Sequence, residues 1–394
     1  MVNARMFELG NAPNAIRALF AYGCKRKAEI GDDKVFDFSL GNPNIPAPDK
    51  VNQTILELLA LPSDALHGYT PAQGTPGVRK AIAESINRRF GMAATADNLY
   101  MTVGAAASFL IAVSAISAAG DEFIVINPYF PEYLVWIEQA GCVAVEVAAR
   151  KDDFQLDLGA IERALTSKTA GIIINSPNNP VGTVYSRESL EGLAQILNAH
   201  QERSGRVVTL ISDEPYREIV YDGIEAPFIA AIYNNTIVCY SYSKSLSLAG
   251  ERIGYLYVCE RMTGADAVYT AVCGAGRALG FVCAPSMFQH VVERCVDVPA
   301  DVVAYTENRA VLTEGLKRLG YEFVEPQGAF YLWVKALEPD AEAFSSRAKA
   351  HELLIVPSKS FGCDGWVRIG YCVNKKTIED SMPAFEALMK EYRP

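Results

Sequence analysis

The feature that most constrains the fold is a regular alternation of short apolar runs and segments of helical character, which begins near Leu99. Six apolar runs occur, at 99–103, 123–126, 171–174, 207–211, 237–240 and 255–258. Strands that alternate with helices form βαβ units, whose right-handed crossovers place the strands side by side in a largely parallel sheet. We therefore predict an α/β fold with a large domain built on a mostly parallel sheet flanked by helices.

The residues that follow these runs are candidates for a ligand site, because ligands of open α/β sheets bind beyond the carboxyl ends of the strands. Five segments hold such positions: Gly104 to Ala106, Asn127 to Phe130, Asn175 to Gly182, Asp213 to Tyr216, and Ser241 to Lys244. The carboxyl ends of parallel strands meet at one edge of a sheet, so these segments are expected to meet there too.

Lys244 has an unusual setting, because it directly follows an apolar run and stands among serines and leucines. A lysine sheltered from water has a lowered amine pKa and can form a Schiff base. Farther along, Arg252 offers a planar fork for phosphate, and Ser241 and Ser243 add hydroxyls. A Schiff-base lysine beside phosphate ligands indicates pyridoxal phosphate. The alternative is a mobile surface loop with an incidental lysine.

The other strand-end segments suit the same cofactor. Gly104, Ala105 and Ala106 open a predicted helix, where free N–H groups and the positive end of the helix dipole favour a phosphate. Asp213 ends a buried strand, where a carboxylate is costly unless it meets a cation such as a protonated pyridine nitrogen. Phe130 is either a ring that stacks on an aromatic cofactor or an ordinary core residue.

The pattern after Pro285 indicates a second, smaller α/β domain. The predicted organisation is an N-terminal segment, 1–45, that joins the small domain, a large cofactor-binding domain, 46–284, and the small C-terminal domain, 285–394. Arg368 lies in an apolar strand of the small domain. Its guanidinium pairs either with a structural carboxylate or with the carboxylate of a ligand.

Apolar spacing also predicts several helices. One runs from Asn14 to Gly23, with Asn14 as its cap and Gly23 as its stop. Others run from Pro76 to Phe90 and from about Ala300 to Leu319. The last helix carries apolar side chains on one face, at Ile378, Met382, Phe385 and Met389.

Composition narrows the possible partners. A net charge of −10 and a pI near 5.1 argue against nucleic acid and anionic membranes. The nine cysteines and four histidines have neither the spacing of a metal site nor that of a disulfide framework, so we expect reduced thiols, no metal and a cytoplasmic location. The uncharged stretch from Met101 to Gly120 is about as long as a membrane span, but its small and hydroxylated residues favour a strand end and a buried helix.

Two other enzyme classes are disfavoured by their motifs. The stretch from Gly274 to Gly280 is glycine-rich like a dinucleotide-binding loop, but its last glycine comes one residue late and no acidic residue follows about 20 positions on at the end of a second predicted strand. No nucleophile-elbow pattern is present, so a Ser-His-Asp hydrolase is not expected.

Together the motifs resemble those of the class I aminotransferases, which are fold-type I pyridoxal-phosphate-dependent enzymes such as aspartate aminotransferase. Asn-Asn-Pro-x-Gly stands at 178–182, Asp-x-x-Tyr at 213–216 and Ser-x-Ser-Lys at 241–244, followed by Arg252. The likeness extends in order from Gly41 to Arg368. Val181 stands where the family most often has threonine, and no proposed role depends on it.

The resemblance implies a role for each candidate residue. Lys244 would hold the cofactor aldehyde, Asp213 would pair with the pyridine nitrogen, and Phe130 would stack on the ring. Asn179 and Tyr216 would bond the ring hydroxyl. The implied phosphate ligands are Ala105, Ala106, Ser241, Ser243 and Arg252.

The resemblance also implies how substrate and subunits meet. Tyr69 would reach the phosphate of the partner subunit, which implies a homodimer with shared active sites. Arg368, with the Gly41 backbone, would grip the α-carboxylate of the substrate. Arg277 is either a second arginine that reads a distal carboxylate from the partner subunit or a structural anchor for its loop.

The implied activity is the transfer of an amino group from an L-amino acid to a 2-oxo acid such as 2-oxoglutarate, with the freed Lys244 amine as general base. Aspartate or glutamate would be the donor if Arg277 reads a distal carboxylate. Two alternatives stay open: a carbon–sulfur β-lyase of the same fold, and a non-catalytic, cofactor-binding regulatory module.

Overall fold

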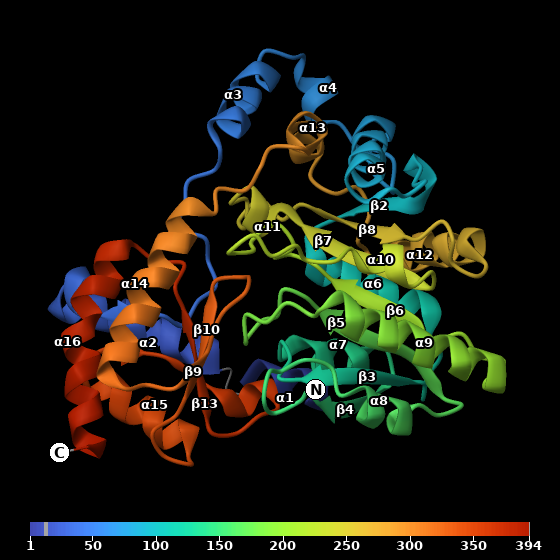
Figure 1. The fold of residues 1–394 in the computed structure, drawn as a ribbon. Coiled ribbons are helices and arrows are strands. Elements are labelled where there is room, and N and C mark those ends of the chain that lie inside the picture. Colours follow the sequence, from blue (N-terminus) through green and yellow to red (C-terminus); the bar gives the residue numbers. More distant parts are fainter. Residues whose placement is uncertain (12–14, 394) are drawn as a thin grey trace.

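The protein is built around a seven-stranded sheet. The structure, a computed structural model, describes residues 1–11 and 15–393 (Figure 1). The strand order is β2-β8-β7-β6-β5-β3-β4, and β8 runs in the opposite direction to the other six strands. The strands are β2 (Leu99–Thr102), β3 (Glu122–Asn127), β4 (Val143–Ala148), β5 (Thr169–Asn175), β6 (Thr209–Asp213), β7 (Thr236–Ser241) and β8 (Gly254–Val258).

All six apolar runs of the sequence are strands of this sheet, which confirms the predicted α/β fold. The seventh strand, β4, was not predicted. It lies at the edge of the sheet and pairs only with β3. Val143 and Glu146 are exposed, so β4 lacks the continuous apolar character of a strand covered on both faces.

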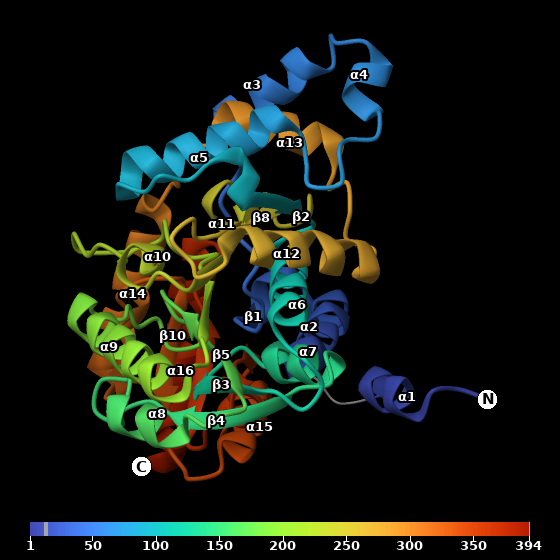
Figure 2. The same ribbon diagram turned by 90° about the vertical axis from the view of Figure 1, so that its right-hand side faces the viewer.

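Helices cover both faces of the sheet, and alternate residues of each strand point to opposite faces. Ile173 of β5 packs in the same cluster as α6 (Ala105–Ile116) and α7 (Glu132–Gln139). Ile172 and Ile174 pack in another cluster with α8 (Leu158–Ala164) and α9 (Arg187–Ser204). Figure 2 shows the sheet between these two helix layers, and α12 (Ala265–Leu279) packs against α6 and β8. The short helices α10 (Ile229–Ile232) and α11 (Tyr242–Ser245) border β7.

A smaller sheet forms the second body. Its antiparallel order is β12 (Val356–Pro357), β13 (Trp366–Gly370), β10 (Tyr331–Lys335) and β9 (Phe323–Val324). The N-terminal region joins it, because β1 (Phe36–Asp37) pairs with β11 (Leu353–Leu354). The covering helices are α2 (Ala15–Ile30), α14 (Val303–Leu319), α15 (Ala341–Ala350) and α16 (Lys375–Tyr392).

The remaining helices are α1 (Ala4–Asn11), α3 (Asp49–Leu58), α4 (Ser63–His67), α5 (Pro76–Phe90) and α13 (Ser286–Cys295). The helix predicted from Pro76 to Phe90 is confirmed by α5, which begins after the Thr75 side-chain cap. α13 packs against α3, α4 and α5. Among the described residues, no helix has both the length and the apolar character that a membrane span requires.

Two predicted features are wrong, both because of glycines. Gly23 does not stop α2, which continues to Ile30. A side chain at Gly23 would come within 2.8 Å of Leu354, so this glycine lets α2 approach β11 closely. The proposed cap, Asn14, lies outside the described residues.

The glycine-rich stretch from Gly274 to Gly280 is also not a loop. It forms the last turns of α12, and only Gly280, with φ 77°, ends the helix. A Cβ on Gly276 would lie 2.3 Å from the Tyr100 hydroxyl, which in turn donates to the Phe281 carbonyl at 2.9 Å. This glycine therefore serves close packing and not nucleotide binding.

Candidate active site

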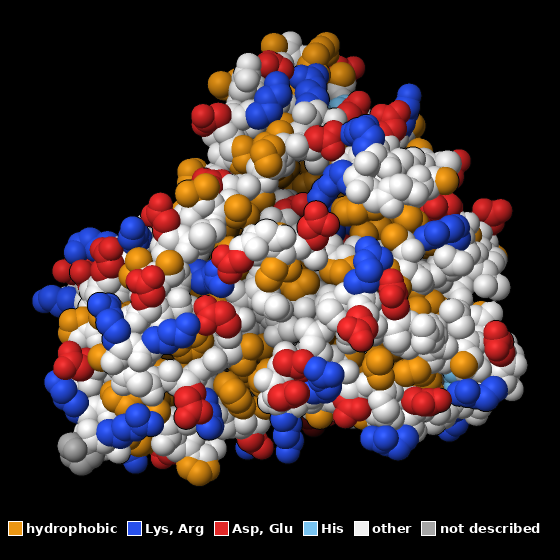
Figure 3. Space-filling view, viewed as in Figure 1, with side chains coloured by type: hydrophobic (Ala, Val, Ile, Leu, Met, Phe, Trp, Pro, Cys, Tyr) orange, Lys and Arg blue, Asp and Glu red, His pale blue; other side chains and the backbone are white. Residues whose placement is uncertain are grey.

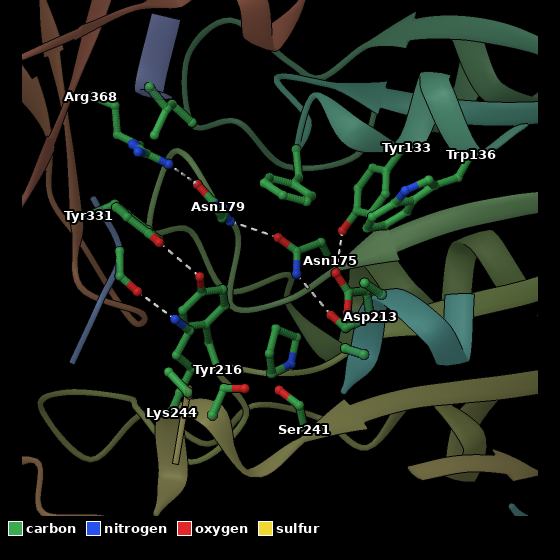
Figure 4. Close-up of a pocket in the computed structure, with 18 of the residues that line it drawn as sticks. Tyr133, Trp136, Asn175, Asn179, Asp213, Tyr216, Ser241, Lys244, Tyr331 and Arg368 are labelled. Atoms are coloured by element: carbon green, nitrogen blue, oxygen red, sulfur yellow. Dashed lines mark hydrogen bonds between the residues drawn. The ribbon is translucent and has the colours of Figure 1, made fainter. Parts of the chain in front are cut away.

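A pocket of about 290 Å³ lies where the carboxyl ends of β5, β6 and β7 face the smaller sheet (Figure 4). Most of the residues singled out from the sequence line it. They are Gly41, Ala105, Ala106, Phe130, Asn179, Asp213, Tyr216, Ser241, Ser243, Lys244, Arg252 and Arg368. The structure thus brings together segments that are more than 300 residues apart in the chain.

Lys244 lies in α11, the short helix that directly follows β7. Its Nζ donates to the Gly41 carbonyl at 2.5 Å and stands 5.4 Å from the centre of the Phe330 ring. No carboxylate pairs with it among the described residues. Burial lowers the pKa of this amine to about 8. A substantial fraction is therefore neutral near physiological pH, which is the form that acts as nucleophile or base.

Asp213 ends β6 deep in the pocket. Its Oδ2 accepts a hydrogen bond from the Tyr133 hydroxyl at 2.5 Å, and its backbone carbonyl accepts one from the Asn175 amide at 2.9 Å. The other carboxylate oxygen, Oδ1, is buried and has no hydrogen-bond partner among the residues that the structure describes. Burial raises the pKa of Asp213 to about 7. The site thus offers a carboxylate that lacks a cationic donor.

Arg368, on β13, is buried at 2 % exposure. Its Nη1 donates to Asn179 Oδ1 at 3.0 Å and its Nη2 to the Ser39 carbonyl at 2.6 Å, while Nε finds no acceptor in the described part of the chain. The guanidinium also lies 4.5 Å from the centre of the Tyr331 ring. Since neutral groups are its only hydrogen-bond acceptors among the described residues, this side chain holds an uncompensated charge that suits a ligand carboxylate.

The opposite end of the pocket suits a phosphate. Gly104 has φ 91° and precedes α6, whose first N–H groups belong to Ala105 and Ala106. The space beside Gly104 is taken by Arg252, because a Cβ on Gly104 would lie 2.8 Å from its Nη2. Arg252 itself has the uncommon φ of 53°, and a backbone strained in this way is typical of functional sites. Together these groups form an anion-binding corner.

Several pocket residues were given no role in the sequence analysis, although Asn175 and Pro215 lie in its candidate segments. They are Ile16, Tyr133, Trp136, Asn175, Pro215, Ala249 and Tyr331. Asn175 could have been found, since it is the last residue of β5 and its side chain bridges the Asn179 N–H, at 2.7 Å, and Asp213. Tyr133 could also have been found, because it lies three residues after Phe130, in the first turn of α7. Tyr331 lies in the pocket because β10 pairs with β13, and no local sequence pattern predicts that pairing.

Three candidate residues do not line the pocket. Gly104 lies just behind it, against Arg252. Tyr69 is fully exposed, at 100 %. Arg277 is exposed in the last turn of α12. The structure describes a single chain, so the last two residues stay predictions that concern the partner subunit.

The comparisons with known proteins agree with this geometry. Residues 33–384 match the family model "Aminotransferase class I and II". The chain is 30 % identical over 398 residues to an aspartate aminotransferase of Thermotoga maritima, covering 98 % of both chains. It is 29 % identical to an aspartate/prephenate aminotransferase of Thermus thermophilus, covering 89 % of both.

Solved structures are similar over the whole length. An amino transferase from Eubacterium rectale has a TM-score of 0.97 at 54 % identity and covers 100 % of both chains. The aspartate aminotransferase of Thermus thermophilus, solved with maleate, has a TM-score of 0.87 at 26 % identity, with 98 % of this chain and 100 % of that chain covered. The chain therefore belongs to the class I and II aminotransferase family, and it is an aminotransferase of the pyridoxal-phosphate-dependent, fold-type I class.

Proposed function

We propose that this aminotransferase binds pyridoxal phosphate in the pocket of Figure 4 and moves an amino group between an L-amino acid and a 2-oxo acid such as 2-oxoglutarate. The observation that carries the proposal is the buried, unpartnered Oδ1 of Asp213 in the pocket that also holds Lys244 and Arg368. A buried acceptor without a donor is costly. A protonated pyridine nitrogen would supply both the missing donor and the opposite charge.

The other pocket residues fit the same cofactor. The phosphate would be held by Gly104, Ala105, Ala106, Ser241, Ser243 and Arg252. Phe130 would stack on the ring, while Asn179 and Tyr216 would bond its hydroxyl. Lys244 would hold the aldehyde, since its amine is sheltered and has no carboxylate partner among the described residues.

The residues around the substrate then have separate tasks. Pyridoxal phosphate, when bound, supplies a conjugated ring that draws electrons from the substrate Cα. Asp213 favours the electron-poor state of that ring, because it places a negative charge beside the ring nitrogen. Lys244 would take the proton from the substrate Cα and deliver it to the cofactor carbon that carried the aldehyde. An amine with a pKa of about 8 can act as such a base near neutral pH. Arg368 grips the α-carboxylate with two parallel N–H groups, which fixes the orientation of Cα.

The experiment that tests this function follows the absorbance of the protein saturated with pyridoxal phosphate. An amino donor added alone should remove the yellow absorbance, and a 2-oxo acid added next should restore it. Formation of pyruvate and a thiol from a cystine-like thioether would indicate the carbon–sulfur β-lyase instead. An absorbance that no amino acid changes would indicate the non-catalytic module.

We also propose a homodimer in which Tyr69 of each subunit reaches the phosphate site of the other, in line with its full exposure here. The division into a large domain, 46–284, and a small domain, 285–394, joined by residues 1–45, is proposed as well.

All nine cysteines are free thiols, which supports a cytoplasmic location. On the face in Figure 3, basic and acidic side chains are interspersed, which fits small-molecule substrates better than nucleic acid.

Aspartate or glutamate is the proposed donor if Arg277 of one subunit reads the distal carboxylate in the other. The side chain of Arg277 is exposed and forms no hydrogen bond or ion pair with the residues that the structure describes. It stands on a helix, so there is no loop for it to anchor. Relatives named aspartate aminotransferase support the same donor class.

Arg277→Ala tests this choice of donor. The variant should lose about 2–4 kcal/mol of transition-state binding for aspartate, because the distal carboxylate loses its partner. Alanine as donor should be almost unaffected, and so should both donors in the control Arg187→Ala, whose side chain is 65 % exposed on α9. The measurement is kcat/KM for each donor. Equal losses of kcat/KM for aspartate and alanine would show that Arg277 does not recognise the side chain of the donor.

A further inference from the structure

Tyr331 touches each part of the site that handles the substrate. Its hydroxyl lies 2.9 Å from the hydroxyl of Tyr216, and its ring lies under the Arg368 guanidinium at 4.5 Å. A Cβ on Gly41 would lie only 1.8 Å from the Tyr331 hydroxyl, so only glycine fits there. The carbonyl of the same Gly41 accepts the hydrogen bond of Lys244. Tyr331 itself is buried at 2 % exposure (Figure 4).

The two tyrosine hydroxyls have no other hydrogen-bond partner among the described residues, so one of them donates to the other. Burial raises the pKa of Tyr331 to about 12, while Arg368 beside it acts in the opposite direction. Both phenols are therefore protonated at neutral pH. Arg368 lowers the pKa of both phenols, but it stacks on the Tyr331 ring and acts more strongly there, so Tyr331 is the more acidic phenol and the better donor of the two.

We propose that Tyr331 is a positioning residue. Its hydroxyl donates a hydrogen bond to the Tyr216 oxygen, which leaves the Tyr216 O–H pointing into the pocket. A hydroxyl that accepts one hydrogen bond donates more strongly in the next, so Tyr331 strengthens the donor that faces the cofactor hydroxyl. The same ring keeps the Arg368 guanidinium in the plane in which it meets the carboxylate. Tyr331 thus connects carboxylate recognition to the proton chemistry at Tyr216. This inference rests on the proposed function.

The test is a pH titration of the cofactor absorbance in the holoenzyme, which reports on the cofactor hydroxyl without turnover. In Tyr331→Phe the ring remains and the hydroxyl is lost. A weaker donor at Tyr216 would leave more negative charge on the cofactor oxygen. That charge would hold the proton on the nearby Lys244 nitrogen more tightly. The pH midpoint of the absorbance titration should therefore be higher in Tyr331→Phe than in the wild type, by about 0.5–1 pH unit for the loss of one hydrogen bond.

Two variants separate this role from a general effect on packing. In a Tyr216→Phe background, Tyr331→Phe should cause no further shift, because Tyr331 acts through the Tyr216 hydroxyl. Tyr305→Phe is the matched control, since the buried Tyr305 hydroxyl has no hydrogen-bond partner within residues 1–11 and 15–393 and the centre of its ring lies 5.2 Å from that of Phe330. It should leave the midpoint unchanged. An unshifted Tyr331→Phe, or a shift of equal size without the Tyr216 hydroxyl, would overturn the inference.

A second readout concerns Arg368. Tyr331→Leu removes the ring as well as the hydroxyl, and KM for the amino donor should rise roughly 2- to 30-fold over that of Tyr331→Phe. Equal KM values in the two variants would contradict the orienting role of the ring. A wild-type protein that binds no cofactor would contradict the proposed function itself, whereas a titrating wild type with unshifted variants would contradict only the role of Tyr331.

Discussion

Asp213→Asn is expected to fold normally and to lose at least about 10- to 100-fold in kcat, since one charged hydrogen bond is worth roughly 1.5–3 kcal/mol. The amide keeps the shape of the side chain but removes its negative charge. The loss should be larger in kcat than in affinity for pyridoxal phosphate, because the charge matters most when electrons move into the ring. Single-turnover absorbance and cofactor titration measure the two effects separately.

A pH series sharpens the same test. Burial raises the pKa of Asp213 to about 7, so the carboxylate loses its charge as the pH falls through that value. Affinity for the cofactor should therefore weaken below about pH 7 in the wild type, and this dependence should flatten in Asp213→Asn. The control is Asp222→Asn, a carboxylate with 60 % side-chain exposure that pairs with Arg309 at 2.7 Å. Near-normal turnover in Asp213→Asn would place Asp213 outside the ring-nitrogen role.

Arg217→Met should lower the free energy of unfolding by about 3–5 kcal/mol, because it leaves a buried carboxylate without its partner. Arg217 has 5 % side-chain exposure and pairs with Glu214 at 2.8 Å and with Glu218 at 3.2 Å. Its guanidinium also lies 4.4 Å from the centre of the Tyr240 ring. The residues of this ion cluster alternate with Asp213 and Tyr216 in the chain, so the cluster holds both the end of β6, which carries Asp213, and the turn after it, which carries Tyr216.

Denaturant unfolding measures this effect. Lys376→Met is the control for an exposed pair, because Lys376 has 78 % side-chain exposure and its bond to Asp380 should be worth at most about 1 kcal/mol. Adding Glu214→Gln to Arg217→Met should recover part of the loss, since the remaining partner is then neutral. If Arg217→Met were as mild as the control, the buried cluster would not be a main support of β6.

Much of the fold could be predicted because the large sheet consists of local, strongly apolar strands. Each of the six predicted runs is buried from both sides, and the carboxyl ends of the five parallel ones mark the pocket without any knowledge of distant contacts. The edge strand β4 could not be recognised in the same way, because half of its residues face solvent and interrupt the apolar run. Gly23 was misread as the end of a helix and the stretch from Gly274 to Gly280 as a loop, because a glycine that permits close packing inside a helix looks in sequence like one that ends it.

The candidate site could be predicted only in part, for a similar reason. Asp213 and Lys244 stand at strand ends, where position alone indicates function. Tyr331 comes into the pocket through antiparallel pairing with β13, in a register that places Trp333 opposite Arg368. Such pairing depends on the tertiary structure, so its partners cannot be read from spacing. Arg277 and Tyr69 depend on contacts beyond one chain.

The most direct test of the central claim is to reduce the yellow protein with borohydride and to map the lysine that then carries the cofactor. The account predicts that the label lies on the peptide that contains Lys244, and that Lys244→Ala incorporates none while it still binds cofactor reversibly. Stable attachment to any other lysine of the wild-type protein would contradict the account.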